Sequence, residues 1–100
     1  MGTYISTVKS INVNATGAIF AGPCRILGLY YVADTTAGSI VIKDGGGTGT
    51  TVATFQTPLG AGNAGEEIAR YIPIPGDGAV CRTSGYATLT NVDKDTIFYG

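Results

Sequence analysis

Short apolar runs separated by glycine-rich turns fill the chain, and no stretch repeats its apolar positions at helical spacing. The candidate strands recur roughly every ten residues, a rhythm typical of a small all-β sandwich. They cover residues 4–13, 18–21, 24–32, 39–43, 50–57, 66–74, 79–82, 86–92 and 96–99. We therefore predict two packed sheets of about eight short antiparallel strands in a jelly-roll-like order. An immunoglobulin-like sandwich is the alternative, although the chain lacks that fold's buried tryptophan.

The turn residues refine this prediction at two places. Pro73 and Pro75 cannot donate hydrogen bonds to a sheet, so the end of strand 66–74 should lie at a sheet edge. The polar run 93–95 predicts the turn before the final strand. Aspartate is favoured in turns because it bonds to nearby backbone.

The strand at 24–32 departs from simple alternation. Its pattern places Leu27, Leu29 and Tyr31 on one face, and Ile26, Tyr30 and Val32 on the other. A strand that is apolar on both faces is expected to be covered on both. A two-layer sandwich covers only one face, so a subunit interface or a loop of the same chain must cover the second.

One hundred residues predict a single domain over 1–100, in which 1–15 form an N-terminal arm or an edge strand. Charged residues make up 13% of the chain, about half the share usual in globular proteins. Glycine (16) and threonine (14) take their place, which predicts a neutral, easily desolvated surface. Such a surface suits a turn-rich sheet protein, or one covered by neighbouring copies or another protein.

Charge and hydropathy argue against two classes of partner. The net charge is −1 and the six basic residues are scattered, whereas nucleic-acid binding needs a clustered basic surface. No apolar run approaches the ~20 residues of a membrane span. The N-terminus lacks the basic-then-apolar layout of a signal peptide, so Cys24 and Cys81 are expected to be reduced and partly buried. A bridge between them would need Cα atoms within ~7 Å, which the sequence does not decide.

Candidate catalytic chemistry is sparse. The chain has no histidine, which removes the commonest general base and zinc ligand. The aspartates fall in predicted turns, and neighbouring Glu66 and Glu67 point to opposite faces of a strand. The glycine-rich run 44–50 lacks the lysine and the following helix of a phosphate-binding loop. We therefore expect no enzyme, no cofactor and no metal site.

Several strand-and-turn segments together resemble a known group of proteins. They are Gly22-Pro23-Cys24-Arg25 leading into Ile26-Leu27-Gly28-Leu29-Tyr30-Tyr31, then Gly38-Ser39-Ile40-Val41-Ile42-Lys43-Asp44-Gly45-Gly46, Ile72-Pro73-Ile74-Pro75-Gly76-Asp77-Gly78, Tyr86-Ala87-Thr88-Leu89-Thr90-Asn91-Val92 and Ile97-Phe98-Tyr99-Gly100. From about Ala21 onward the chain resembles the small β-sandwich virion proteins of tailed bacteriophages, especially those of marine and cyanobacterial hosts.

The resemblance implies a structural component of the virion, assembled in the host cytoplasm. It implies a capsid decoration (cement) protein, or an accessory protein of the head or tail, that binds the major capsid protein or another virion protein. We expect a homo-oligomer, either a dimer or a trimer. The residues expected at the partner surface are Thr3, Tyr4, Ile5, Tyr30, Tyr31, Arg70 and Tyr71.

Two alternatives remain at this stage. One is a fibre or knob module that binds a host-surface carbohydrate or receptor, with Tyr30, Tyr71 and Tyr86 as an aromatic platform. The other is a secreted enzyme or a disulfide-stabilised domain.

Overall fold

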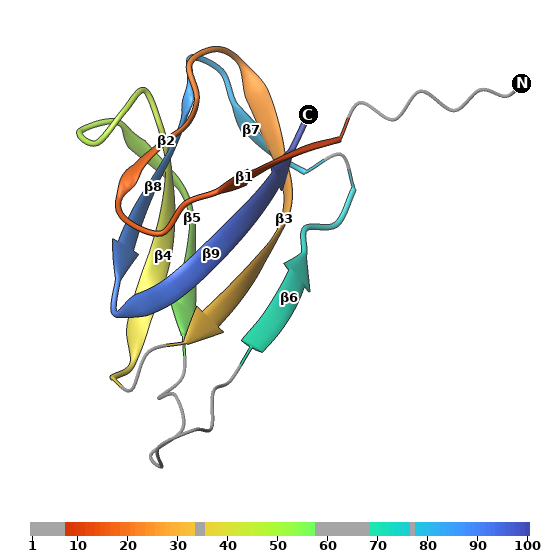
Figure 1. Ribbon diagram of the computed structural model, residues 1–100. Helices are drawn as coiled ribbons and strands as arrows, with labels where there is room; N and C mark the ends of the chain where they lie inside the picture. The colour runs from red at the N-terminus through yellow and green to blue at the C-terminus, as the bar shows by residue number, and fades with distance from the viewer. Residues whose placement is uncertain (1–7, 34–35, 58–68, 77) are drawn as a thin grey trace, which may run out of the picture.

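The computed structural model describes residues 8–33, 36–57, 69–76 and 78–100 (Figure 1). Within these ranges no helix is long and apolar enough to cross a membrane. The strands are β1 (Lys9–Asn12), β2 (Gly17–Phe20), β3 (Cys24–Ala33), β4 (Gly38–Asp44), β5 (Thr50–Thr57), β6 (Ala69–Pro73), β7 (Ala79–Cys81), β8 (Gly85–Thr90) and β9 (Val92–Tyr99). The all-β prediction is confirmed.

The strands form two antiparallel sheets that pack face to face, seen as two layers in Figure 1. The first, here called the β3 sheet, has the order β1-β9-β3-β6, with β7 also paired to β3. The second, the β4 sheet, has the order β2-β8-β4-β5. β6 and β7 can be counted as one interrupted sixth strand, so that β8 and β9 become the seventh and eighth. The two sheets then have the orders 1-8-3-6 and 2-7-4-5, the arrangement of a jelly roll. The sandwich prediction and its preferred order are therefore confirmed.

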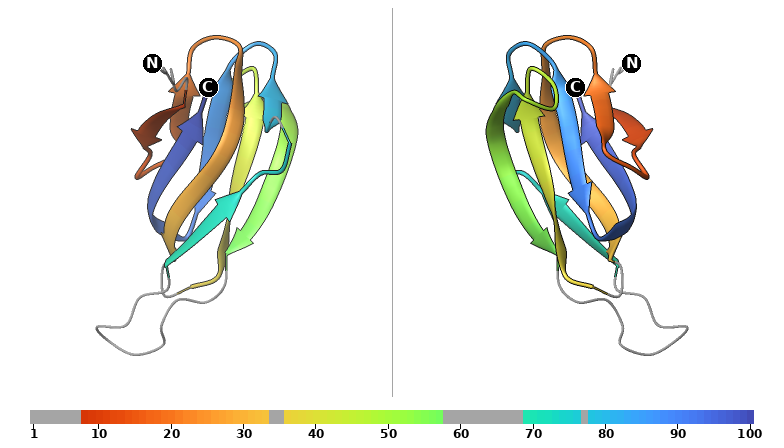
Figure 2. Two further views of the ribbon diagram at one scale, coloured as in Figure 1. Left: turned by 90° about the vertical axis from the view of Figure 1, so that its right-hand side faces the viewer. Right: turned by 90° about the vertical axis from the view of Figure 1, so that its left-hand side faces the viewer.

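β6 and β7 follow one another along the same edge of β3 (Figure 2). β6 pairs with the second half of β3 and β7 with the first half. β6 ends at Pro73, at the edge of its sheet, where a missing N–H donor costs no ladder bond. This edge position was predicted from the prolines.

The core lies between the sheets and contains aliphatic residues from both. Its fully buried members include Ile26, Leu29 and Ile97 from the β3 sheet, and Ile40 and Ile42 from the β4 sheet. The alternation of β3 is broken by a register shift between Ile26 and Gly28 in its pairing with β9. Such an irregularity re-aims the residues on either side of it. The prediction that Ile26 shares a face with Tyr30 is therefore wrong, because Ile26 is buried in the core with Leu29.

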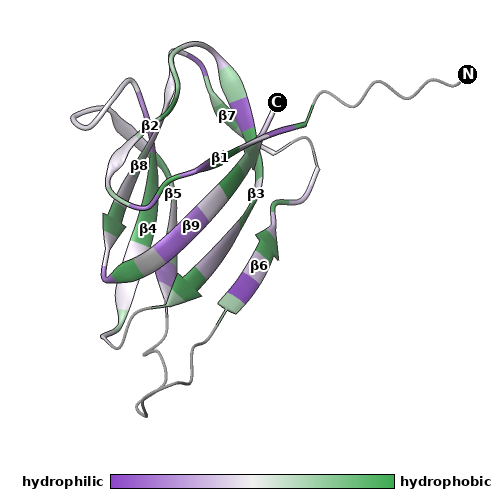
Figure 3. Cartoon of the chain, in the orientation of Figure 1, coloured by the Kyte–Doolittle hydropathy of each residue, from purple (hydrophilic) through white to green (hydrophobic). Residues whose placement is uncertain are grey.

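The turn between the last two strands also differs from the prediction. Residues 93–95 belong to β9, and the chain reverses at Asn91, whose φ is 52°. Asparagine tolerates this left-handed conformation better than most residues. Its side-chain amide donates to the Ala37 carbonyl at 3.1 Å. A hydrophilic band consequently crosses the middle of β9 (Figure 3).

Candidate interaction surface

The outer face of the β3 sheet carries exposed aromatic side chains. Tyr30 on β3 is paired with Tyr71 on β6, so the two project from the same face. Their side chains are 42% and 59% exposed, the highest values among the large aromatic residues described. Val80 on β7 adds a further exposed apolar side chain at the other end of β3.

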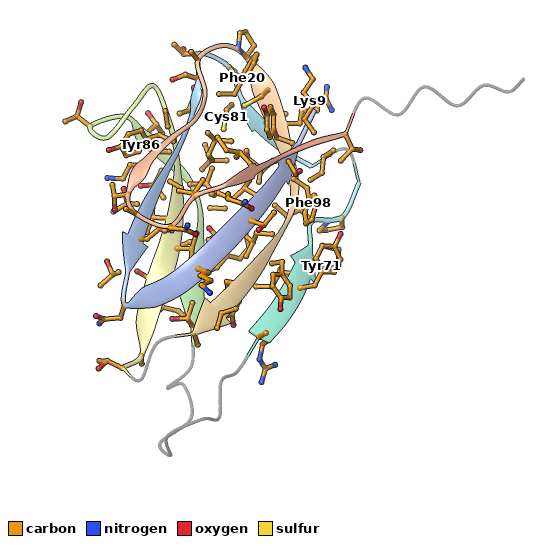
Figure 4. All side chains as sticks on the ribbon, in the orientation of Figure 1. Lys9, Phe20, Tyr71, Cys81, Tyr86 and Phe98 are labelled. Carbon is orange, nitrogen blue, oxygen red and sulfur yellow. The ribbon has the colours of Figure 1, made fainter. Side chains whose placement is uncertain are left out.

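Phe98 completes this surface from β9. Its ring meets Tyr71 edge to face, with ring centroids 6.0 Å apart (Figure 4). Gly28 lies between them on β3, paired with Phe98 on one side and Pro73 on the other. A Cβ at Gly28 would come within 3.1 Å of the Tyr71 hydroxyl and of the Ile72 carbonyl oxygen. The absence of a side chain at Gly28 thus lets Tyr71 lie over the strand, and we call Tyr30, Tyr71 and Phe98 the outer patch.

The outer face of the β4 sheet has a different character. Its central cross-strand row consists of Val41 between Thr88 and Thr54, and the neighbouring row of Ser39 between Thr90 and Gln56. The threonine and serine side chains that dominate these rows are typical of a strand face that remains in water. The central rows of this face are therefore rich in hydroxyl groups, whereas the β3 sheet presents the adjacent exposed aromatic rings.

The structure sorts the predicted interface residues. Tyr30 and Tyr71 lie together on the outer face, as described. Tyr31 is wrongly predicted as a surface residue: it is 1% exposed because alternation along β3 turns it into the core. Arg70 is exposed and paired with Tyr31, so it projects to the side opposite Tyr71 at the sheet edge. Thr3, Tyr4 and Ile5 lie outside the described residues.

Tyr86 does not join Tyr30 and Tyr71 in one platform. It belongs to β8 in the β4 sheet and lies on the far side of the molecule from Tyr71 (Figure 4). Its ring packs near Gly47, where an added Cβ would come within 3.3 Å of the ring and its hydroxyl. The three-tyrosine platform considered for carbohydrate binding is therefore absent.

A second aromatic contact lies where the two sheets meet near β1. The Phe20 and Tyr99 rings have centroids 5.5 Å apart, and the Lys9 ammonium lies 5.5 Å from the Phe20 centroid. Phe20 is 38% exposed. A lysine over a ring face contributes about 0.5–1 kcal/mol at such an exposed site. This contact ties β1 to β2 and does not extend the outer patch.

Asp44 has a structural role at the end of β4. Its carboxylate accepts hydrogen bonds from the backbone N–H groups of Thr83 (2.8 Å), Arg82 (2.9 Å) and Ser84 (3.2 Å). These bonds hold the pKa of the carboxyl below its ordinary value. Asp44 therefore fastens the β7–β8 turn to the β4 sheet, a long-range role that the sequence did not indicate.

Asp95 is the one buried carboxyl among the described residues. It is 1% exposed, and neither carboxylate oxygen accepts a well-aligned hydrogen bond from the described residues. Burial raises the pKa of this group to about 7, and the nearby N–H of Thr96 offsets only part of the effect. The direct cross-strand neighbour of Asp95 is Tyr31 on β3, which is also buried in the core.

The described residues contain no cluster of side chains that could hold a metal ion. No group of three or more cysteine, aspartate or glutamate side chains gathers there, and the chain contains no histidine. Cys24 and Cys81 are free thiols, both buried. Sequence reasoning missed Phe98 as a member of the outer patch and Gly28 as the position that makes room for Tyr71. Neither role can be recognised until β9 is known to pair with β3.

A search against protein families, curated proteins and solved structures found no match to this chain.

Proposed function

We propose that this chain is a non-enzymatic structural protein of a tailed-phage virion, a capsid decoration (cement) protein that binds and stabilises the outer capsid surface. The observation that carries the proposal is the asymmetry of the two sheets. One outer face presents the outer patch, and the other presents threonine and serine. The resemblance of its strand-and-turn segments to phage virion proteins supplies the partner.

The outer patch has the composition of a protein-binding surface. Tyrosine and phenylalanine are enriched at interface cores, whereas most charged residues are depleted there. Tyr71 is held in place by Phe98 and Gly28, so little side-chain freedom is lost when a partner covers it. A stable interface needs about 800 Å² from each partner, so the contact must extend beyond these rings.

The proposed occupant is the major capsid protein or another virion protein, with this chain arriving as a dimer or trimer. Thr3, Tyr4 and Ile5 remain predicted contacts of an N-terminal arm that could add a strand to a neighbour's sheet. Shell docking needs a rigid face and no catalytic group, which suits a small two-sheet sandwich.

The direct test is co-sedimentation and mass photometry with capsid shells of the parent phage assembled without this protein. The wild type should bind the shells, and the double variant Tyr30→Ser/Tyr71→Ser should lose at least about tenfold in affinity, the usual effect of removing aromatic hot spots. Tyr86→Ser is the matched control, because it removes a tyrosine from the opposite sheet and should leave shell binding unchanged. Thermal midpoints must show that each variant is folded.

Two results would overturn the proposal. One is a wild-type monomer that never associates with shells. The other is equal shell binding by the wild type and the double variant. A fibre or knob module would instead bind a glycan on an array and lose that binding with Tyr30→Ser or Tyr71→Ser while ignoring shells.

A further inference from the structure

Cys24 and Cys81 face each other across two paired strands. They are direct partners in the antiparallel register of β3 and β7, although 57 positions separate them in the sequence. Directly opposed residues in such a ladder have Cα atoms about 4.5 to 5.5 Å apart. Disulfides span Cα separations of roughly 4.4 to 6.8 Å, so the register already supplies the required backbone distance.

The two side chains leave their paired strands on the same face of the sheet and are both buried, so they share one space inside the sandwich. Each thiol lies close enough to shift the pKa of the other. Gly85 on β8 provides part of that space, because a Cβ there would lie 3.0 Å from the Cys24 Sγ. The dithiol is thus enclosed between the sheets by a glycine that no bulkier residue could replace without a shift.

A pocket borders the cysteine pair. It has a volume of about 400 Å³, and its lining residues include Cys24, Cys81, Arg25, Val80 and Arg82. Cys24 retains 6% exposure, whereas Cys81 is fully buried. Cys24 is therefore the thiol that an incoming reagent meets first.

Burial makes both thiols slow to react. It raises the pKa of Cys24, and it raises the pKa of Cys81 to about 12. The thiolate is the form that attacks a disulfide, so exchange at neutral pH proceeds through a small ionised fraction. Low reactivity toward outside reagents combined with close approach to each other favours a structural bridge over a catalytic thiol.

We propose that Cys24 and Cys81 form a site for an intramolecular disulfide, which a small-molecule disulfide such as oxidised glutathione installs without rearranging the strands. The Cys24 thiolate attacks one sulfur of the oxidant, which forms a mixed disulfide and releases one glutathione thiol. The Cys81 thiolate then attacks the Cys24 sulfur and releases the second glutathione. Two thiol protons and two electrons leave the protein, and the oxidant is reduced to two thiols.

The bridge would fasten the shortest strand of the β3 sheet. β7 has three residues and pairs only with β3 among the described strands. A bond from residue 24 to residue 81 closes a long loop and removes much of the freedom of the unfolded chain. The oxidised protein should therefore unfold at a temperature higher by about 10 °C or more.

The test compares the wild-type protein before and after incubation with excess oxidised glutathione. We expect intact mass to show the loss of two hydrogen atoms, peptide mapping to link the segments containing Cys24 and Cys81, and the thermal midpoint to rise. Dithiothreitol should reverse all three changes. The single variants Cys24→Ala and Cys81→Ala are the matched controls and should show no rise in midpoint with oxidant.

Several results would overturn the proposal: a dithiol unchanged under conditions that oxidise a model dithiol peptide, a product that stops at the glutathione adduct, a cross-linked dimer, or a bridged protein with a lower midpoint. Because the central comparison uses only the wild type, failure of a variant to fold leaves the test intact. Shell binding is measured separately, so this result and the proposed function stand or fall independently.

Discussion

At the scale of single residues, Asp95 shows how a buried position overrides a local preference. Its sequence context, Asp93-Lys94-Asp95, has the composition of a turn. The side chain instead enters the core from β9, opposite Tyr31 on β3. Among the described charged side chains, Arg70 lies one strand beyond Tyr31 in the same cross-strand row, and Lys94 is the sequence neighbour. Neither forms an ion pair that would stabilise the carboxylate.

This burial predicts an unusual pH dependence of stability. The folded pKa of Asp95, about 7, lies above the ordinary value of 3.8, so the folded state holds its proton more tightly than the unfolded chain does. Stability from this group is fully present below about pH 4 and is lost as pH rises to about 7. The side chain of the variant Asp95→Asn cannot ionise. As the pH rises over this range, the free energy of unfolding of the variant should therefore increase relative to that of the wild type, by up to roughly 4 kcal/mol.

Urea unfolding of the wild type and Asp95→Asn at several pH values from 4 to 8 measures this difference directly. Contributions from the other carboxylates cancel in the comparison, because both proteins contain them. If the difference in unfolding free energy between the two proteins is the same at every pH, the Asp95 carboxyl titrates normally in the folded protein.

At the scale of elements, two local irregularities determine which side chains reach which face. The shift in β3 between Ile26 and Gly28 turns Ile26 into the core and leaves Gly28 beneath Tyr71. The positive φ of Asn91 moves the β8–β9 turn ahead of the charged run and lets β9 begin at Val92. Together these features place Phe98 of β9 opposite Gly28 of β3, and in this register the Phe98 ring contacts Tyr71 on the outer face.

The β8–β9 turn yields a test with two substitutions at one site. Asn91→Ala should cost about 1–2 kcal/mol, because a Cβ-bearing residue without a polar side chain disfavours the left-handed conformation and the bond to Ala37 is lost. Asn91→Gly loses the same bond but relieves the backbone, so it should cost less than half as much. Equilibrium urea unfolding measures both losses of stability, provided that the unfolding free energy depends on urea concentration with the same slope in the variants and the wild type.

Equal losses in the two variants would mean that the side-chain bond to Ala37, and not the backbone conformation, is what asparagine supplies. A gain in stability for Asn91→Ala would contradict the left-handed turn itself.

At the scale of the whole molecule, the pairing is strongly non-local. β1, near the start of the chain, pairs with β9 at the end, and β2 pairs with β8. Each sheet is therefore completed only when the last strands have joined. Long loops must close before these contacts form, and closing them costs entropy that local contacts cannot offset early.

Refolding should therefore be slow for a domain of this size. Stopped-flow dilution from urea should show refolding over milliseconds to seconds, the range of all-β proteins with distant strand pairing. The experiment should be run under reducing conditions so that the Cys24–Cys81 pair stays open. Refolding complete within about 100 microseconds would contradict the non-local topology.

The strands and the fold class could be predicted because they depend on local patterns. Nearly every apolar run became a strand, and Pro73 marked a sheet edge, since a missing donor has the same consequence in any sheet. The faces of β3 could not be predicted before Gly28, because the register shift between Ile26 and Gly28 reverses the alternation on that side of it. Tyr31 was misplaced on the surface for a related reason: both faces of the strand are apolar in sequence.

The sequence by itself determined an all-β chain with low charge, no histidine, edge prolines and turn positions rich in glycine. Only the tertiary structure decided which distant segments meet: Tyr71 over Gly28, Asp95 inside the core and Cys24 opposite Cys81. The physical reason is that strand formation follows local side-chain preference, whereas register and strand order follow the joint burial of both sheets. The outer patch and the Cys24–Cys81 pair both depend on register and strand order.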